Sequence, residues 1–191
     1  KPENYGKKFY GPSTLRKGIE KSRNLMTVRV AQNLGFKKIA SISKNLGIYD
    51  STPELLSVSL GSNETTLLKL TSAYSTFVNG GKKINPKMIK RIQDRIGKTI
   101  YNSENRSCSG CDIFLEQNKQ NLKILDKKQQ IISPETAYQI TSMLEGAVKR
   151  GTGKKLKSLN VPLAGKTGTT NDNFDAWFIG YTSELVIGVY I

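Results

Sequence analysis

Histidine is absent from this chain of 191 residues. Its absence excludes a serine–histidine catalytic pair, a histidine general base and a histidine-ligated metal centre within the chain. Any base that the chain supplies must therefore be a lysine, a carboxylate or a thiolate.

Cysteine is nearly absent. Cys108 and Cys111, in the segment RSCSGCD, are the only two. A structural zinc site takes four nitrogen or sulfur ligands, and two cysteines without histidine do not supply them in a monomer. We therefore predict no metal and no cofactor. The pair is expected to form a local disulfide or to remain as two loop thiols without a catalytic role.

Long apolar runs and acidic residues are also scarce. No stretch approaches the roughly 20 apolar residues of a membrane-spanning helix, and the opening KPENYGKKFYG lacks the apolar core of a signal peptide. The 30 basic residues outnumber the 15 acidic ones, for a formal net charge of +15, which leaves nucleic acid and anionic membranes open as partners. The densest basic cluster, at 149–157, carries no interleaved aromatic residue to stack on bases. We therefore expect no nucleic acid.

Five segments are predicted to be helical from their apolar spacing and their start and stop signals. Pro12 and Ser13 open the first, whose turns continue through Ser22, and Gly35 and Gly47 close the next two as C-caps. The predicted segments are 11–22, 24–35, 36–47, 62–81 and 133–151.

A β-hairpin is predicted around Gly97 and Lys98, because isoleucines flank this turn on both sides. From 102 to 130 the sequence is polar and aperiodic. We interpret the whole chain, 1–191, as part of one domain, and 102–130 as a long loop or small insertion within it.

The sequence ends in three apolar stretches, VPLAGKTGTT, DAWFIGYT and ELVIGVYI. The links between them are too short for the crossover that parallel neighbours need, so an antiparallel sheet is predicted. Helices followed by such a sheet make an α+β protein, with an antiparallel sheet flanked by helices.

The segment AGKTGTT is compatible with two kinds of site. A phosphate-binding loop reads G-x-x-x-x-G-K-[ST], but Asn160 stands where the first glycine belongs and no helix-forming sequence follows. A strand edge fits better, because side chains alternate and Thr167 and Thr169 then share one side, roughly 7 Å apart. Gly168 between them lets a substrate backbone approach closely. Lys166 adds positive charge for a substrate carboxylate.

The surroundings of this motif make its interpretation specific. Lys166-Thr167-Gly168, with the flank TNDNFDAWFIGYT and the upstream EKSRN, resembles the transpeptidase domain of class A (bifunctional) penicillin-binding proteins. The resemblance extends over GPSTLRKGIEKSRNLMTVRVAQNLG, SLGSNETTLLKLTSAYSTFVNGG and TAYQITSMLEGAVKRGTG, so it covers nearly the whole chain. It implies the fold of penicillin-binding proteins and β-lactamases, here incomplete. It also implies serine acyl transfer at the D-Ala-D-Ala end of peptidoglycan stem peptides, with β-lactam antibiotics as mimics.

The resemblance assigns roles to particular residues. The S-x-N motif of the family falls on Ser22 and Asn24; the serine relays a proton toward the leaving nitrogen, and the asparagine holds the substrate amide. Lys166 interacts with Ser22 and with the substrate carboxylate. The residues that bind the substrate are Thr167, Gly168 and Thr169.

The S-x-x-K motif, which carries the nucleophilic serine of the family, is missing ahead of Ser22. There, Ser13-Thr14-Leu15-Arg16 ends in an arginine, which stays protonated and cannot serve as a base. A literal S-x-x-K begins at Ser41, but it follows the S-x-N motif and lies among the apolar residues from Phe36 to Ile42, which predict amphipathic packing. We therefore expect the nucleophile to come from other residues of a longer parent chain.

That parent is expected to carry a glycosyltransferase domain outside this chain. We expect it on the periplasmic side of the bacterial inner membrane, anchored by a segment that is also outside this chain. Two alternatives stay open. One is a stand-alone serine hydrolase of the β-lactamase or D,D-carboxypeptidase type. The other is a basic module that binds nucleic acid or a membrane surface.

Overall fold

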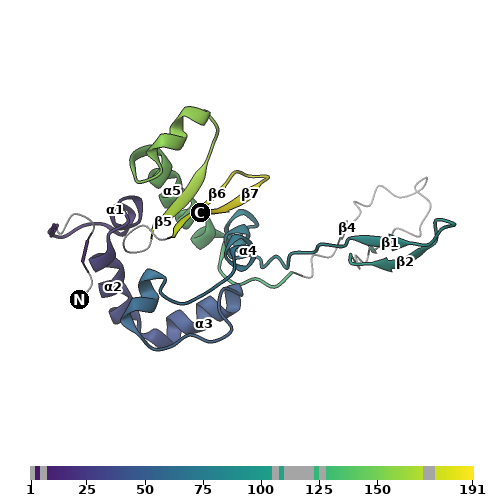
Figure 1. Cartoon of the computed structure of the whole chain (residues 1–191), viewed down its shortest axis with the longest axis horizontal. Coiled ribbons are helices and arrows are strands. Elements are labelled where there is room, and N and C mark those ends of the chain that lie inside the picture. Colours follow the sequence, from purple (N-terminus) through teal and green to yellow (C-terminus); the bar gives the residue numbers. More distant parts are fainter. Residues whose placement is uncertain (1–2, 5–7, 105–107, 110–122, 125–127, 170–174) are drawn as a thin grey trace. The chain divides into compact units, whose positions relative to one another are not determined.

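The computed structural model describes residues 3–4, 8–104, 108–109, 123–124, 128–169 and 175–191 (Figure 1). The chain divides into two compact units: a first unit of Lys1–Ile84 with Gln130–Ile191, and a second unit of Asn85–Gln129. Among the described residues, no helix combines the length and the apolar character needed to cross a membrane.

The second unit contains the predicted hairpin. Strands β1 (Arg91–Gln93) and β2 (Thr99–Asn102) pair antiparallel. The turn between them holds Gly97 with a φ of 84°, a left-handed conformation that glycine adopts without strain. The hairpin prediction is therefore confirmed.

The predicted loop or insertion at 102–130 falls mostly outside the described residues and stays a prediction. Within it, the structure describes the two ends, 102–104 and 128–130, and a short antiparallel pair, β3 (Cys108–Ser109) and β4 (Lys123–Ile124). Cys111 lies outside the described residues, so the predicted alternatives for its pairing with Cys108 also stay predictions.

The first unit contains a three-stranded antiparallel sheet in the order β5-β6-β7. Its strands are β5 (Ala164–Thr169), β6 (Ala176–Tyr181) and β7 (Val186–Tyr190). Lys166 pairs with Ile179 and Thr167 with Phe178 across the β5–β6 ladder. The predicted antiparallel sheet is confirmed, and β5, which carries the K-T-G motif, is an edge strand of the described sheet.

The helices of the first unit follow the predicted segments closely. They are α1 (Leu15–Glu20), α2 (Asn24–Leu34), α3 (Phe36–Leu46), α4 (Leu67–Val78) and α5 (Pro134–Arg150), with short 3-10 helices η1 (Leu56–Leu60) and η2 (Lys154–Leu159). Gly35 and Gly47 follow α2 and α3 with positive φ angles, as their prediction as C-caps requires. Ser133 caps α5 by accepting a hydrogen bond from the Thr136 N–H, and Pro134 opens the helix.

Two details of the helix predictions are wrong. Helix α1 is shorter than expected: Thr14, not Ser13, caps it by accepting from the Lys17 N–H, and it ends at Glu20 instead of continuing through Ser22. In α3, Phe36 and Ile39 are half-buried as the apolar spacing predicted, but Ile42 is exposed, and the buried residue of the helix is Ser43. The apolar spacing therefore indicated the helix and most of its packed face correctly, and the error is confined to Ile42.

The core lies between the sheet and the two longest helices. Leu144 of α5 packs with Ala164 and Tyr181, which pair across β5 and β6. From α4, Tyr74 packs edge-on against Tyr181 with ring centroids 6.3 Å apart. Both helices therefore cover the same face of the sheet, and Gly188 lets α4 come close, because a Cβ there would meet the Thr71 hydroxyl at 2.2 Å.

Candidate active site

A hydroxyl from a helix turn and an ammonium from the edge strand meet at one place. Lys166 Nζ lies 2.8 Å from Ser22 Oγ and donates a hydrogen bond to it. The same Nζ donates to the main-chain carbonyl of Thr167 at 2.7 Å. Lys166 therefore links the turn between α1 and α2 to the edge of β5. An ammonium has three N–H donors, so these two contacts leave one that can face a ligand.

Ser22 sits in an unusual backbone conformation for its residue type. Its φ is +50°, in the left-handed region. The Ser22 N–H bonds to the Ile19 carbonyl, and the Arg23 N–H bonds to the Gly18 carbonyl. These two bonds form a Schellman motif, in which the left-handed position is usually glycine. A side chain at this position costs stability, so its presence suggests a functional reason for the serine.

The environment of Lys166 changes its protonation. Lys166 points to the same face of the sheet as Ala164, two residues before it, because side chains alternate along a strand. That face is the one covered by α4 and α5. Burial there lowers the pKa of Lys166 to about 8. The side chain is therefore mostly a cation at pH 7 and becomes neutral well below the pH at which an exposed lysine does.

Thr167 and Thr169 share one side of β5, as predicted. They pair with Phe178 and Ala176, and both belong to the face opposite to Lys166. Gly168 and Thr169 are exposed. The predicted lysine and threonines therefore meet only at the strand edge, where the Lys166 ammonium reaches the Thr167 carbonyl.

Thr152 is a neighbour of this edge that the sequence did not reveal. Its Oγ1 lies 2.7 Å from Thr167 Oγ1. Thr152 follows the end of α5 at Arg150, in the segment RGTG. That segment contains a hydroxyl between two glycines, but only the packing of α5 against β5 shows that it meets Thr167.

Two other predicted positions lie apart from the Lys166 ammonium contacts. Asn24 is the first residue of α2, and its side-chain amide donates to the Glu3 carbonyl at 3.0 Å. Its described hydrogen bond therefore goes to the N-terminal segment. Ser41 and Lys44 are both exposed on α3, and the expectation that this S-x-x-K has no catalytic part stays a prediction.

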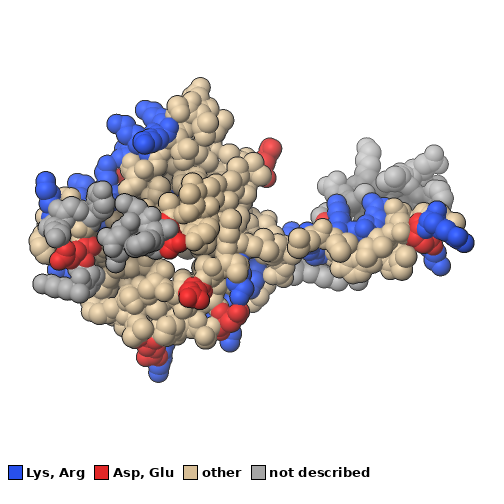
Figure 2. Space-filling model, viewed as in Figure 1, with Lys and Arg blue, Asp and Glu red and all other residues tan. Residues whose placement is uncertain are grey.

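In the part of the chain that the structure describes, charged and metal-binding groups do not indicate another site. Figure 2 shows basic side chains dispersed over the visible face of the first unit, with acidic side chains among them. Some of these charges pair locally, such as Lys69 with Asp50 at 2.8 Å. Among the residues that the structure describes, no group of three or more cysteine, aspartate or glutamate residues is placed to hold a metal ion.

Comparisons with known proteins agree with this geometry. A family model described as the penicillin binding protein transpeptidase domain matches residues 2–189. Penicillin-binding protein 1A of Rickettsia bellii is 45% identical over an alignment of 195 residues that covers 100% of this chain and 24% of that protein. The chain thus spans about a quarter of the length of that curated relative.

Solved structures share the architecture. A crystal structure of penicillin-binding protein 1A from Haemophilus influenzae has a TM-score of 0.81 and 30% identity, and the match covers 99% of this chain and 31% of that one. Penicillin-binding protein A of M. tuberculosis, solved as an imipenem acyl-enzyme complex, has a TM-score of 0.74, covers 100% and 46%, and at 21% identity shows the fold alone. The predicted α+β fold class is therefore confirmed.

Proposed function

Because this chain belongs to the transpeptidase family of penicillin-binding proteins, we propose that it forms part of the active site of a peptidoglycan D,D-transpeptidase. The observation that carries this proposal is the 2.8 Å contact between Lys166 Nζ and Ser22 Oγ. These two residues belong to the K-T-G and S-x-N motifs, which are far apart in the sequence. A hydroxyl held against a partly buried amine is suited to proton transfer.

The reaction is an acyl transfer in two steps. A serine hydroxyl attacks the carbonyl between the two D-Ala residues of one stem peptide, the C–N bond breaks, and D-Ala leaves with a proton on its nitrogen. An amine of a second stem peptide then attacks the serine ester, which forms the cross-link and frees the serine. The attacking serine comes from an S-x-x-K segment in the rest of the parent chain. β-Lactams act as mimics of D-Ala-D-Ala and acylate the same serine.

Ser22 and Lys166 serve the leaving group in this proposal. The Lys166 ammonium donates to Ser22 Oγ, which leaves the Ser22 hydroxyl proton free to move toward the departing D-Ala nitrogen. Lys166 can replace that proton because burial lowers its pKa to about 8, close to neutral pH. Asn24 holds the substrate amide, which requires its side chain to exchange the Glu3 carbonyl for the substrate.

The edge of β5 binds the substrate carboxylate. Thr167 and Thr169 present hydroxyl donors on one side of the strand, and the exposed Gly168 between them leaves room for the substrate backbone. The Lys166 ammonium adds a positive charge to which a carboxylate binds more strongly than to a neutral donor.

The whole protein is proposed to extend well beyond this site. Because the Rickettsia bellii relative is about four times longer than its match to this chain, there is room for the glycosyltransferase domain and the membrane anchor expected of class A penicillin-binding proteins. The parent would then act on the periplasmic side of the bacterial inner membrane. The family match over 2–189 supports this reading over a basic module that binds nucleic acid or a membrane surface.

The proposal is tested with the full-length gene product and a fluorescent penicillin. We expect a covalent adduct that survives denaturation, and a rate of adduct formation that falls sharply in Lys166→Ala and Ser22→Ala. Lys149→Ala, which removes an exposed lysine paired with Glu145 at 2.7 Å, is the matched control and is expected to react like the wild type. A full-length protein that takes no label would refute the proposal.

A further inference from the structure

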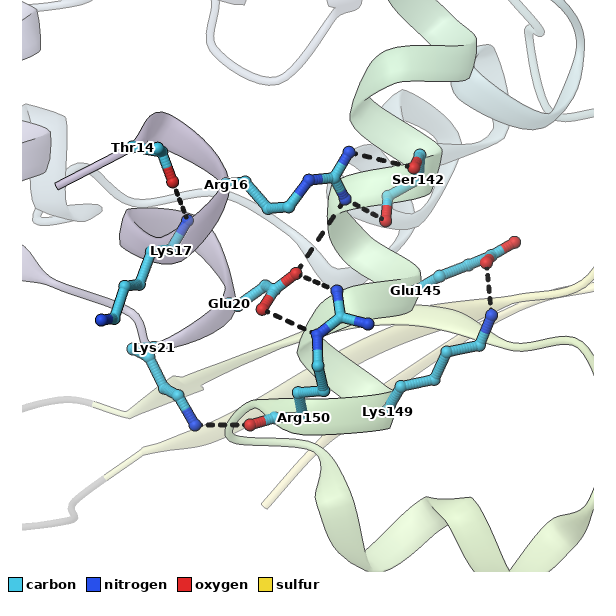
Figure 3. Close-up of polar contacts among 9 residues, drawn as sticks. All are labelled: Thr14, Arg16, Lys17, Glu20, Lys21, Ser142, Glu145, Lys149 and Arg150. Carbon is cyan, nitrogen blue, oxygen red and sulfur yellow. Dashed lines mark hydrogen bonds and ion pairs between the residues drawn. The ribbon is translucent and has the colours of Figure 1, made fainter.

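Glu20 is a buried acidic residue at the end of α1, two residues before Ser22. Its side chain is 8% exposed. The carboxylate accepts two hydrogen bonds from the Arg150 guanidinium, from Nε at 3.3 Å and from Nη2 at 2.5 Å (Figure 3). Arg16 adds a longer ion pair at 3.9 Å and holds Ser142 of α5 with its other contacts. A buried carboxylate with a two-pronged arginine partner is costly to disturb.

The main chain repeats the same connection. The Thr152 N–H donates to the Glu20 carbonyl at 3.2 Å. In the other direction, Lys21 Nζ donates to the Arg150 carbonyl at 2.5 Å (Figure 3). The end of α1 and the end of α5 are therefore joined by side chains and by backbone.

Two glycines, one within α5 and one directly after it, allow the end of α1 to approach α5 closely. A Cβ on Gly146 would lie 1.9 Å from Glu20 Oε1, and a Cβ on Gly151 would lie 2.0 Å from the Glu20 carbonyl oxygen. Either methyl group would force the Glu20 segment away from α5. The carboxylate thus occupies space that the sequence leaves open for it.

Glu20 and Arg150 each lie two residues from a residue of the candidate site. Ser22, two residues after Glu20, bonds to Lys166 at 2.8 Å. Thr152, two residues after Arg150, meets the Thr167 hydroxyl at 2.7 Å. The Glu20–Arg150 pair therefore closes a ring of contacts that runs through the S-x-N turn and the K-T-G strand and returns to the pair.

We propose that Glu20 and Arg150 are positioning residues that hold the Ser22 hydroxyl against the Lys166 ammonium. The inference rests on the proposed transpeptidase function for its catalytic readout. Neither residue touches the Lys166 ammonium; each acts through the two-residue link to Ser22 or Thr152. A shift of about 1 Å in such a link can change a rate by about 100-fold.

The central variant is Glu20→Gln in the full-length gene product. It keeps the shape of the side chain and removes its charge, so Arg150 loses its ionic partner. We expect the rate of acylation by a fluorescent penicillin to fall about 10- to 100-fold. We also expect the Lys166 amine to titrate above pH 8, because a displaced Ser22 turn admits water to the ammonium. That titration is followed by pH-dependent acetylation of Lys166 and mass spectrometry.

Further variants separate positioning from stability alone. Arg150→Lys keeps the charge and is expected to retain more acylation than Arg150→Gln, and it provides a milder test if Glu20→Gln fails to fold. Glu145→Gln, which breaks the exposed pair with Lys149 on the same helix, is the control and should leave both readouts unchanged.

The outcomes distinguish this inference from the function on which it rests. If wild-type protein takes no penicillin, the transpeptidase proposal fails, and the Lys166 titration alone decides the positioning role. If Glu20→Gln lowers the melting temperature but acylates and titrates like the wild type, Glu20 is only structural and the inference is wrong.

Discussion

Ser22 Oγ and Lys166 Nζ lie 2.8 Å apart although 144 positions separate the two residues in the chain. The contact joins the turn after α1 to the edge strand β5, and it exists because α5 packs against both α1 and β5. Any change that moves this helix relative to the sheet is therefore expected to act on the proposed proton path.

The pH dependence of substrate capture follows from the protonation of Lys166. Its pKa is lowered by burial to about 8, so the cation that attracts a substrate carboxylate is present below that pH and lost above it. We predict that kcat/KM for a carboxylate-bearing substrate falls as pH rises through about 8. The pH dependence of kcat/KM reflects the pKa values of the free enzyme. The measurement is therefore a series of initial rates at low substrate concentration, from about pH 6 to about pH 10.

Lys166→Arg is the control for this profile. Arginine stays charged over the whole range, so the fall near pH 8 should disappear, although the plateau should be lower because arginine does not release a proton to Ser22. If the fall persists in Lys166→Arg, another group causes it and the assignment to Lys166 is wrong.

Ser22→Gly is predicted to separate stability from activity. Glycine adopts the left-handed conformation of position 22 without a Cβ clash, so the free energy of unfolding should rise by up to about 1 kcal/mol. Activity should fall at the same time, because the hydroxyl that contacts Lys166 is gone. Thermal unfolding and penicillin acylation are measured on the same samples.

Ser22→Ala completes this comparison. It also removes the hydroxyl but keeps a Cβ in the left-handed conformation, so it should lose activity without gaining stability. Equal unfolding free energies for the glycine and alanine variants would show that the backbone at Ser22 carries no strain.

Thr152→Val is predicted to weaken substrate binding. The change removes a hydroxyl 2.7 Å from that of Thr167 with little change of shape. One such hydrogen bond contributes about 0.5–1.5 kcal/mol, so KM should rise roughly 2- to 10-fold with little change in kcat. Thr141→Val, which removes a hydroxyl that accepts from Tyr181 at 3.0 Å, is the matched control. A loss confined to kcat would contradict a role for Thr152 in binding.

The isolated chain of 191 residues is predicted to form no covalent adduct with a labelled β-lactam. Its only literal S-x-x-K begins at Ser41, which is exposed on α3, and the proposed nucleophile belongs to the rest of the parent. The test is labelling followed by a denaturing gel, with the full-length protein as the positive control. Label that appears on the isolated chain and disappears in Ser41→Ala would identify Ser41 as a nucleophile.

Local signals in the sequence were enough for most of the fold. The left-handed glycines Gly35 and Gly47 end helices where the apolar spacing breaks off, and the short links around β6 permit only antiparallel neighbours. These features depend on a few adjacent residues, so a short stretch of sequence is enough to indicate them.

The candidate site was predictable only where a motif named its residues. Ser22 and Lys166 came from the S-x-N and K-T-G patterns, but the early end of α1 and the positive φ of Ser22 depend on a Schellman motif that no serine signals by itself. Thr152 and Glu20 were missed for a related reason. Their contacts depend on how the C-terminal end of α1 packs against the C-terminal end of α5, and no local sequence pattern specifies that packing.

Gly146 leaves a space that the Glu20 carboxylate and the end of the Arg150 guanidinium fill: a Cβ there would lie 1.9 Å from Glu20 Oε1 and 2.7 Å from Arg150 Nη2. The two positions are therefore expected to covary among relatives: a sequence with a larger residue at 146 should carry a shorter or uncharged one at 20. In this chain, Gly146→Ala should lower the stability of the fold, and adding Glu20→Ala should recover part of that stability while acylation stays low, because the pair with Arg150 is gone. The lack of a side chain at position 146 therefore reflects the presence of glutamate at position 20. A substitution at either position is expected to require a compensating change at the other.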